Sequence, residues 1–468
     1  MSMAARPSAP TSAWSRLRES GFPHAPLAAI VVIALQCVHG LADEFVYDAA
    51  QYWAGSVALV SGGDAAVAGV LQMRGALTSV IYVPPALLSA LFGPASASWT
   101  VLAWNSLLAV FLCVFLLPRI AAIIARGPSS PLRVWVSALA GGVIVSGFSR
   151  FPLLDVWAVA LALLGLYGLA TGTRWWIAGL SGFALMFAAN VRPAYLAPVL
   201  IAAAVLIFVR PKVVPWAIPG AALGLIPQLL LNVTVMGAWS VVPIGTSALM
   251  NVQATYATFA TRYDTVLTPG HFPGQFYCDP GYAALQLGDE KPTSAPGVLL
   301  SAVRNLPDSL SFFSGKAAAS LHWSFATPYE HPPGPGTSLM AFLVIGIAAS
   351  GLVALFWLTT RSWRERTPRL VSLSLVGFWA GAVGTLVLST PETRFAIPVV
   401  LIGLIGVIAA IPSPLRFTRP RPGTVIAIAI ALVLAVALFA LGKSVVGYPM
   451  PPGNMIITSL ETCAAMLR

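Results

Sequence analysis

The chain has 468 residues, of which 58% are hydrophobic and only 9% charged, and its mean hydropathy is +0.84. A soluble domain carries about 25% charged residues, so this composition excludes a soluble globular protein. The formal net charge of +11 is scattered in short clusters between apolar stretches, without a basic stripe of interleaved aromatic residues, which argues against nucleic-acid binding. The sequence predicts an all-α polytopic membrane protein, because in lipid the backbone must satisfy its own polar groups.

Apolar stretches of membrane-spanning length recur from residue 25 onward. The preceding residues, 1–24, contain arginines and little apolar content, which predicts a disordered cytoplasmic tail. Eleven transmembrane helices are expected at 25–42, 99–118, 134–149, 155–171, 175–190, 194–209, 213–231, 338–359, 370–389, 395–412 and 424–441. The first stretch is also compatible with a cleaved signal peptide, but every later loop fits a retained first helix.

Charge sets the expected orientation, because short loops rich in Lys and Arg stay in the cytoplasm. With the N-terminus inside, only Glu19 and Glu365 of the 15 acidic residues lie inside. Segment 75–93 is apolar but broken by two prolines, and a crossing there would invert every later loop. We expect it to be an interfacial or re-entrant piece of the first outer loop. The inside loops then hold Arg119, Arg126, Arg133, Arg174, Arg210, Lys212, Arg361, Arg364, Arg366, Arg369, Arg416, Arg419 and Arg421.

Two large extracytoplasmic loops, 43–98 and 232–337, interrupt the transmembrane domain at 25–441, and the tail 442–468 also lies outside. The second loop is rich in Pro, Gly, Tyr and Phe and has no clean strand alternation, so we expect short amphipathic interfacial helices in it. Cys278 and Cys463 both fall on this side, where oxidation is possible, and a disulfide between them is a hypothesis.

The acidic pair Asp43-Glu44 closes the first apolar stretch and is the most informative motif of the chain. Carboxylates at the rim of a membrane are costly in lipid, so by default they mark a functional site. Arginines on the same side run against the orientation preference, and their planar fork suits phosphate. These groups predict a site for a phosphate-bearing lipid with an acidic catalytic group at the water boundary. The outer turns and loops contribute Arg74, Arg150, Asp155, Arg192, Lys316, His322, Glu392 and Arg394.

Each of these residues also has a plainer interpretation. Arginines at a membrane rim reach lipid headgroups with their long side chains, which applies to Arg150, Arg192 and Arg394. Asp48 is interpreted as facing water or capping a helix that begins near Ala49, and Asp155 as a cap of the fourth span. His322 is interpreted as a satisfied interfacial residue rather than a metal ligand.

Five segments, in their order and membrane side, resemble motifs of the GT-C class of multi-spanning glycosyltransferases, which use polyprenyl-phosphate sugars. The class includes dolichyl-phosphate-mannose protein mannosyltransferases and lipid A aminoarabinose transferases. The aminoarabinose transferases have a Lys where this chain has Val83, so Arg74 or Lys316 would have to supply that charge. The segments are Asp43–Ala50, the stretch from Tyr82 to Pro85 with Leu91–Gly93, Phe148–Asp155, Asn232–Gly237 and Glu392–Pro398.

The resemblance implies an inverting transfer of a sugar from a polyprenyl-phosphate donor to an acceptor hydroxyl on a glycan, lipid or protein. The active site would face the outside of a bacterial inner membrane. Asp43, or alternatively Glu44, is the expected general base, and Asp155 orients the acceptor or helps to hold a divalent cation. Phosphate binding is assigned to Arg74, Arg192 and Arg394 with Lys316 in reserve, and secondary roles to Tyr82, Arg150, His322 and Glu392.

A membrane transporter or lipid flippase is the main alternative, because intramembrane carboxylates and arginines also serve proton relays. Transporters tend to carry such groups near the midplane, whereas here the spans are nearly free of charge and the charges gather at one rim. An O-antigen ligase or polymerase would share the substrate class but not the early acidic motif. A non-catalytic membrane scaffold is the remaining alternative.

Overall fold

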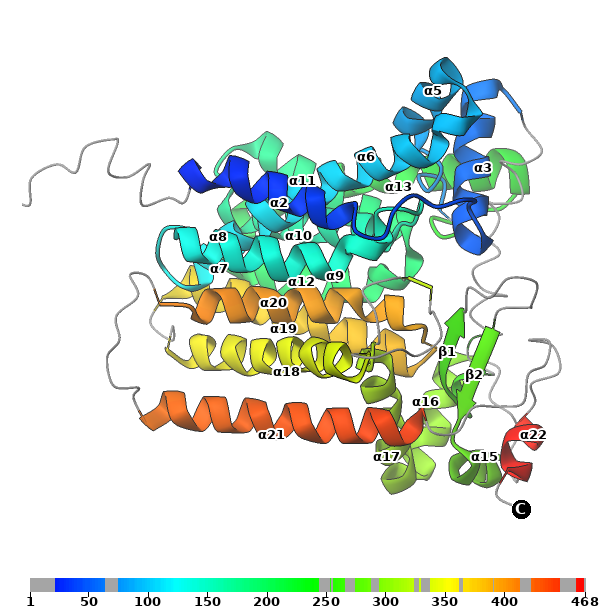
Figure 1. Cartoon of the computed structure of the whole chain (residues 1–468), viewed down its shortest axis with the longest axis vertical. Helices are drawn as coiled ribbons and strands as arrows, with labels where there is room; N and C mark the ends of the chain where they lie inside the picture. Colours follow the sequence, from blue (N-terminus) through cyan, green and yellow to red (C-terminus); the bar gives the residue numbers. More distant parts are fainter. Residues whose placement is uncertain are drawn as a thin grey trace, which may run out of the picture.

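The computed structural model describes residues 22–63, 75–243, 253, 256–265, 274–287, 294–323, 328–329, 337–361, 365–389, 391–412, 422–446 and 460–466. Within these ranges, helices run side by side along one common direction (Figure 1). Their bounds are α2 Ala25–Gln36, α6 Ala97–Val110, α7 Leu117–Ile124, α8 Pro131–Val136, α9 Gly142–Val145, α10 Asp155–Thr171, α11 Trp175–Val191, α12 Leu196–Val209, α13 Val214–Met236, α18 Thr337–Arg361, α19 Arg366–Val387, α20 Ile397–Ala410 and α21 Pro422–Val445.

Seven helical segments among the described residues are long and apolar enough to cross a membrane, so the protein is an integral membrane protein. Several join shorter helices end to end, as α6 and α7 do through a π-helical stretch at Phe111–Leu116. The segments are Pro94–Ile124, Pro131–Phe148, Pro211–Met236, Ser338–Arg361, Arg366–Val387, Thr393–Ala410 and Pro422–Val445. The other four expected spans correspond to shorter apolar helices, α2, α10, α11 and the segment Pro193–Phe208, so the count of eleven crossings stays a prediction.

The first helix is shorter than expected, which corrects the prediction of a continuous helix over 25–42. It ends at Gln36, whose side-chain amide donates hydrogen bonds to its own helix at Val32 O and to Gly142 O on α9. A left-handed residue, Gly40, follows at φ 68°. The acidic pair Asp43-Glu44 is therefore carried by an irregular connection rather than by a helix end.

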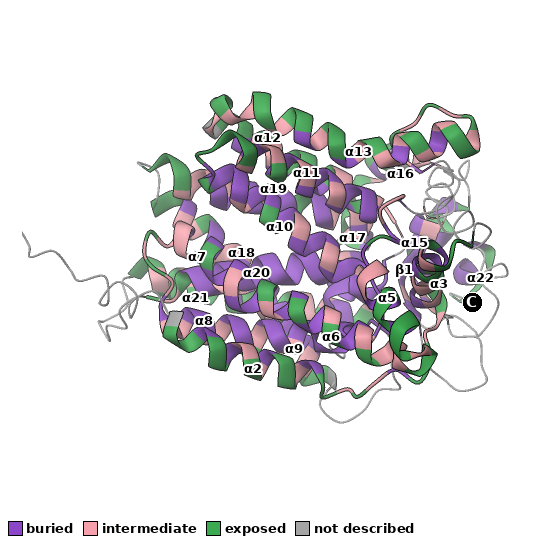
Figure 2. Ribbon diagram, turned by 90° about the horizontal axis from the view of Figure 1, so that it is seen from above, coloured by how far each residue is buried: buried purple, intermediate pink, exposed green. Residues whose placement is uncertain are grey.

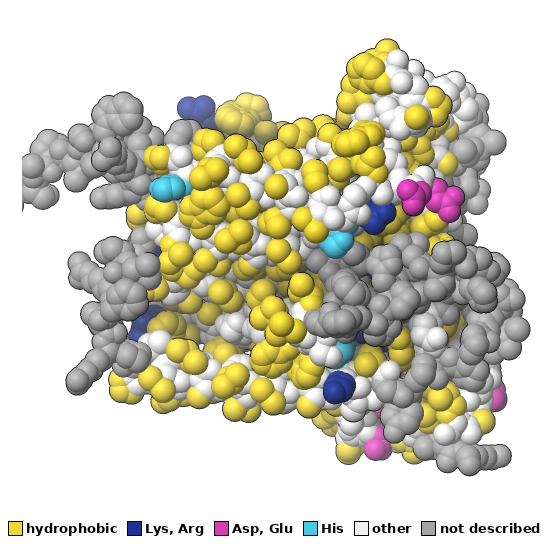
Figure 3. Space-filling view, in the orientation of Figure 1, with side chains coloured by type: hydrophobic (Ala, Val, Ile, Leu, Met, Phe, Trp, Pro, Cys, Tyr) yellow, Lys and Arg dark blue, Asp and Glu magenta, His cyan; other side chains and the backbone are white. Residues whose placement is uncertain are grey.

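The described turns between these helices lie at the two ends of the bundle (Figure 1). At the end called here the basic end, Arg126 pairs with Glu365 at 2.8 Å and Arg133 donates to the carbonyl of Ile411 at 2.7 Å. The flank between the two ends is covered by apolar side chains (Figure 3). This arrangement agrees with helices that cross a membrane and turn alternately on its two sides.

The opposite end, called here the capped end, carries the elements that lie outside the bundle (Figure 1). Both large loops contain short helices, whose position at a membrane interface stays a prediction, and the ten residues of α5 are too few to cross a bilayer. A two-stranded antiparallel sheet was not expected, because neither of its strands alternates cleanly in the sequence. The elements are α3 Tyr47–Ser61, α5 Val83–Phe92, β1 Ala260–Thr265, β2 Gly274–Cys278, α15 Pro280–Gln286, α16 Ala295–Arg304, α17 Leu306–Leu321 and α22 Leu460–Ala465.

The core of the bundle is built around α20, which is buried along nearly its whole length (Figure 2). It packs against α18 through glycines, because a Cβ atom on Gly351 would overlap the backbone of Gly403, and one on Gly406 would overlap that of Gly351. Small residues allow helix backbones to approach closely in lipid. By contrast, α13 and α21 expose most of their apolar side chains, as expected for helices at the lipid boundary.

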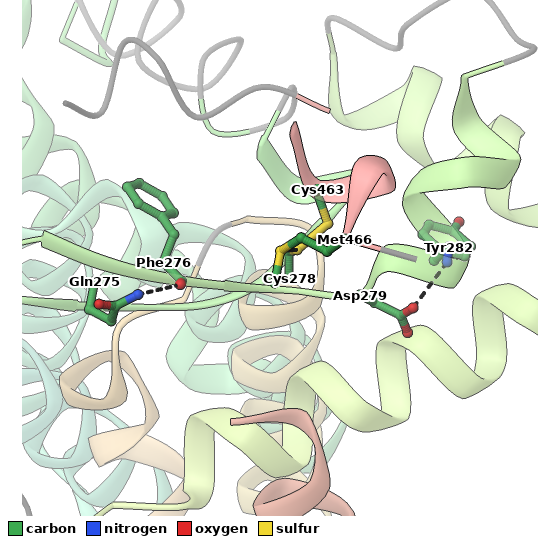
Figure 4. The surroundings of a disulfide bond; sticks show 7 residues. All are labelled: Gln275, Phe276, Cys278, Asp279, Tyr282, Cys463 and Met466. Atoms are coloured by element: carbon green, nitrogen blue, oxygen red, sulfur yellow. Dashed lines mark hydrogen bonds between the residues drawn. A yellow bond between two sulfur atoms is a disulfide. The ribbon is translucent and has the colours of Figure 1, made fainter. Parts of the chain in front are cut away.

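The hypothesis that Cys278 and Cys463 are bridged agrees with the structure, which joins them by a disulfide with their Cα atoms 6.2 Å apart (Figure 4). Cys278 ends β2 and Cys463 lies in α22, so the bond fastens the C-terminal helix to the second large loop. Phe276 and Leu460 pack in the small apolar cluster around it.

Candidate functional site

The capped end holds the acidic pair that the sequence singled out. Asp43 and Glu44 are exposed in the connection between α2 and α3. Arg150 reaches this connection from the turn after α9, where its Nη2 donates a hydrogen bond to Leu41 O at 2.7 Å. Partial burial lowers the pKa of Arg150, and the negative charge of Asp43 opposes that effect. The structure thus places one guanidinium beside the candidate base.

Arg394 lies deeper and binds two carboxylates. Its Nη2 contacts Asp48 Oδ2 at 2.7 Å and Glu392 Oε1 at 3.2 Å, and its Nε contacts the other oxygen of Glu392. The side chain of Arg394 is only 4% exposed, and that of Asp48 is 18% exposed. A forked, charge-assisted arrangement of this kind is rigid and specific in geometry.

A second ion pair lies next to the first. Arg192, at the turn after α11, pairs with Asp155 at 3.0 Å, and Asp155 is nearly inaccessible at the start of α10. The ring of Phe395 lies between the two pairs. Its centroid is 4.4 Å from the guanidinium carbon of Arg192 and 5.4 Å from that of Arg394. The five residues Asp48, Asp155, Arg192, Glu392 and Arg394 are called here the ion network.

The ion network contains three carboxylates and two guanidinium groups. Burial raises the pKa of Glu392 to about 7; the positive charge of Arg394 lowers this pKa, and the negative charge of Asp48 raises it. A proton on Glu392 near neutral pH makes the network electrically neutral. This balance is what burial at the edge of a membrane requires.

An unusual backbone conformation places Asp48 in the network. Tyr47 begins α3 with φ 52°, a left-handed value that bulky residues rarely adopt. Its ring packs edge-on against Tyr329, whose hydroxyl donates to Val46 O at 3.2 Å. Arg394 in turn lies 5.8 Å from the Tyr329 ring centroid. Strain of this type concentrates at functional sites, where the surrounding contacts hold it.

These contacts correct the interpretation of two acidic residues. Asp48 neither faces water nor caps the helix, because α3 has Val46 at its N-cap position and Asp48 binds Arg394. Asp155 makes no capping hydrogen bond at the start of α10 and instead pairs with Arg192. Sequence reasoning therefore missed Asp48 as a member of the site, although it lies only five residues from Asp43 in the same acidic motif.

Lys316 and His322 differ from their expected positions as well. Lys316 is completely buried in α17, where Nζ donates to Ala257 O at 3.0 Å and lies 5.3 Å from the Phe312 ring centroid. Burial lowers its pKa, so it is not a cation available at the rim. His322 is not satisfied, since its Nε2 is buried without a hydrogen-bond partner, and burial lowers its pKa to about 4. Its ring stacks on Phe439.

Tyr82 has a supporting position. It is fully buried, and its hydroxyl contacts Leu153 O at 2.6 Å and Asn105 Oδ1 at 3.1 Å. It therefore holds the Phe148–Asp155 segment against the first large loop. Arg74 lies outside the described residues.

The part of the chain that the structure describes contains no group of three or more His, Cys, Asp or Glu side chains arranged to hold a metal ion. The carboxylates of the ion network point at guanidinium groups instead. Comparison of the chain with known protein families, with curated proteins and with solved structures finds no match.

Proposed function

We propose that the protein is an inverting glycosyltransferase that moves a sugar from a polyprenyl-phosphate donor to an acceptor hydroxyl. Its capped end would face the extracytoplasmic side of a bacterial inner membrane. The observation that best supports this proposal is the ion pair between Asp48 and Arg394, which joins residues 346 positions apart. It brings the early acidic motif and the late Glu-Thr-Arg-Phe motif together at one end of the bundle.

In this proposal Asp43 is the general base, because it is exposed at the water boundary beside Arg150. It takes the proton of the acceptor hydroxyl as that oxygen attacks the anomeric carbon, and the bond to the lipid phosphate breaks. A positioned base contributes about 10²–10⁴-fold in rate. The donor's lipid tail would lie along the apolar flank of the bundle.

The phosphate leaving group gains negative charge and needs a nearby cation. Arg150 suits this role better than Arg192 or Arg394, because the latter two already neutralise carboxylates. Arg150 is only partly buried, and its Nη2 donates to a neutral carbonyl, Leu41 O. The ion network then acts as the scaffold that fixes the acidic connection.

The test uses purified full-length protein in nanodiscs and a panel of polyprenyl-phosphate sugars, with release of polyprenyl phosphate as the readout. Asp43→Asn should lose nearly all turnover, and Arg150→Gln should raise the donor KM. Glu44→Gln, the neighbouring exposed carboxylate, is the matched control and should keep most activity. Normal turnover by Asp43→Asn would exclude this base, and no turnover of any donor by the wild-type protein would exclude the proposal.

One observation favours a transporter as the second candidate. Glu392 is buried with a pKa of about 7, and such a carboxyl can carry a proton near neutral pH. A transporter would acidify or alkalinise the lumen of proteoliposomes when substrate is added, and Glu392→Gln would abolish that signal. A glycosyltransferase would show no such coupling.

A further inference from the structure

A cavity of about 850 Å³ opens at the basic end, away from the candidate site. Three separate turns meet there, namely the turn before α11, the turn before α13 and the start of α19. Its walls contain cationic and aromatic side chains and no carboxylate. The lining residues are Thr173, Arg174, Trp175, Trp176, Arg210, Pro211, Lys212, Val213, Trp216 and Arg366.

Four cations line this cavity, and none of them forms an ion pair with a carboxylate among the residues that the structure describes. Arg210 Nη1 donates to Ala170 O at 3.0 Å, and Arg366 Nη2 donates to Phe208 O at 2.6 Å. These bonds to neutral carbonyls fix the two guanidiniums without compensating their charge. Arg174 and Lys212 form no ion pair with any carboxylate in the described part of the chain.

The backbone adds to this positive charge. Helices α11, α13 and α19 all begin at the cavity without a side-chain capping bond, and the N-cap residue of α19, Glu365, pairs with Arg126 at 2.8 Å. The N-terminus of a helix carries a partial positive charge and favours anions. Placing Arg174 and Lys212 at such ends is unfavourable unless an anion neutralises them.

The aromatic residues indicate what kind of anion fits. Trp175 and Trp216 lie 5.7 Å apart between ring centroids, and with Trp176 they remain 43% to 64% exposed. Tryptophan is enriched where a membrane meets water, because its ring is apolar and its N–H is polar. The wall thus offers apolar contact at membrane level beside the cations.

We propose that this cavity binds the phosphate headgroup of an anionic phospholipid. The cations and helix ends contact the phosphate, and the tryptophans contact the glycerol and upper acyl region. Because this site is at the basic end, it is distinct from the proposed catalytic site. Free inorganic phosphate has the same charge chemistry but no apolar part, so competition distinguishes the two sources.

The experiment measures phosphatidylglycerol binding to the full-length protein by native mass spectrometry, with phosphatidylcholine as the neutral reference. The double variant Arg174→Gln/Lys212→Gln should bind phosphatidylglycerol roughly 30-fold more weakly, since each cation near an anionic lipid surface contributes about 1 kcal/mol. The matched control, Arg119→Gln/Arg361→Gln, removes two cations at the same end but outside the cavity and should retain binding.

A second measurement uses the tryptophans. Phosphatidylglycerol brominated on its acyl chains should quench the fluorescence of the wild-type protein more than that of Trp216→Phe. Equal lipid binding by the cavity and control variants would overturn the proposal. Complete displacement of phosphatidylglycerol by inorganic phosphate would also overturn it, because the ligand would then be a free anion.

Discussion

Replacing Arg394 by Gln should destabilise the protein strongly, because it leaves Asp48 and Glu392 buried without a cation. Removing one partner of a buried ion pair costs about 3–5 kcal/mol. The costs of leaving the two carboxylates unpaired do not add, because the pKa of Glu392 is already about 7 and this group can take up a proton. Most of the cost falls on Asp48, so we expect a loss of about 3 kcal/mol in the free energy of unfolding. Arg394→Lys should lose about half as much, because it keeps the charge but not the forked contacts.

The assay is unfolding of the full-length protein in detergent at neutral pH, followed by tryptophan fluorescence. The double variant Asp48→Asn/Arg394→Gln should recover much of the loss, because it no longer holds an unpaired charge. Arg119→Gln, an exposed arginine in α7, is the control and should change stability by less than about 0.5 kcal/mol. If Arg394→Gln unfolded like the wild type, or if the double variant were worse than the single one, the reasoning about the ion network would be refuted.

Three further predictions concern stability in the same assay. The pKa of Glu392 is about 7 in the folded protein and 4.5 in the unfolded chain. The free energy of unfolding of the wild type should therefore fall as the pH rises from about 4.5 to about 7. Glu392→Gln should abolish this pH dependence. Cys278→Ser should cost about 5 kcal/mol, because the bond to Cys463 links residues 185 positions apart, and reductant should reproduce this loss in the wild type. Gly351→Val should lower the unfolding temperature, since its side chain would overlap Gly403 on α20, whereas Gly346→Ala, which meets open space, should not.

The bundle could be predicted from the sequence because its signals are local. Runs of apolar residues predicted the positions of the long bundle helices, and the charged turn around Arg126 and Glu365 lies at one end of the bundle. The hairpin of β1 and β2 could not be predicted, because it depends on contacts with distant parts of the chain. One of these is the hydrogen bond from Tyr263 N to Pro391 O. The burial of Lys316 could not be predicted for a related reason: it depends on contacts with residues far away in the chain, such as the bond from Nζ to Ala257 O.

The sequence predicted most of the charged residues of the candidate site, but not which of them form ion pairs with one another. Rim arginines and acids were recognised individually, yet their partners lie far away in the chain, as in the pairs of Arg192 with Asp155 and Arg394 with Asp48. The sequence motif itself contains more than one acid, and only tertiary structure separates exposed Asp43 from Asp48. Between these two acids, Tyr47 has a left-handed backbone conformation that no local sequence pattern predicts.

Charge balance assigns different tasks to the arginines at the capped end. A phosphate that took the contacts of Arg394 Nη2 or Nε, or of Arg192 Nη1, would displace a carboxylate and leave it unpaired, at a cost of several kcal/mol. Arg150 carries no such penalty, because it gives a hydrogen bond to a neutral carbonyl and lies beside an exposed acid. The chemistry of the proposed transfer therefore falls on the exposed connection, and the ion network keeps that connection in place.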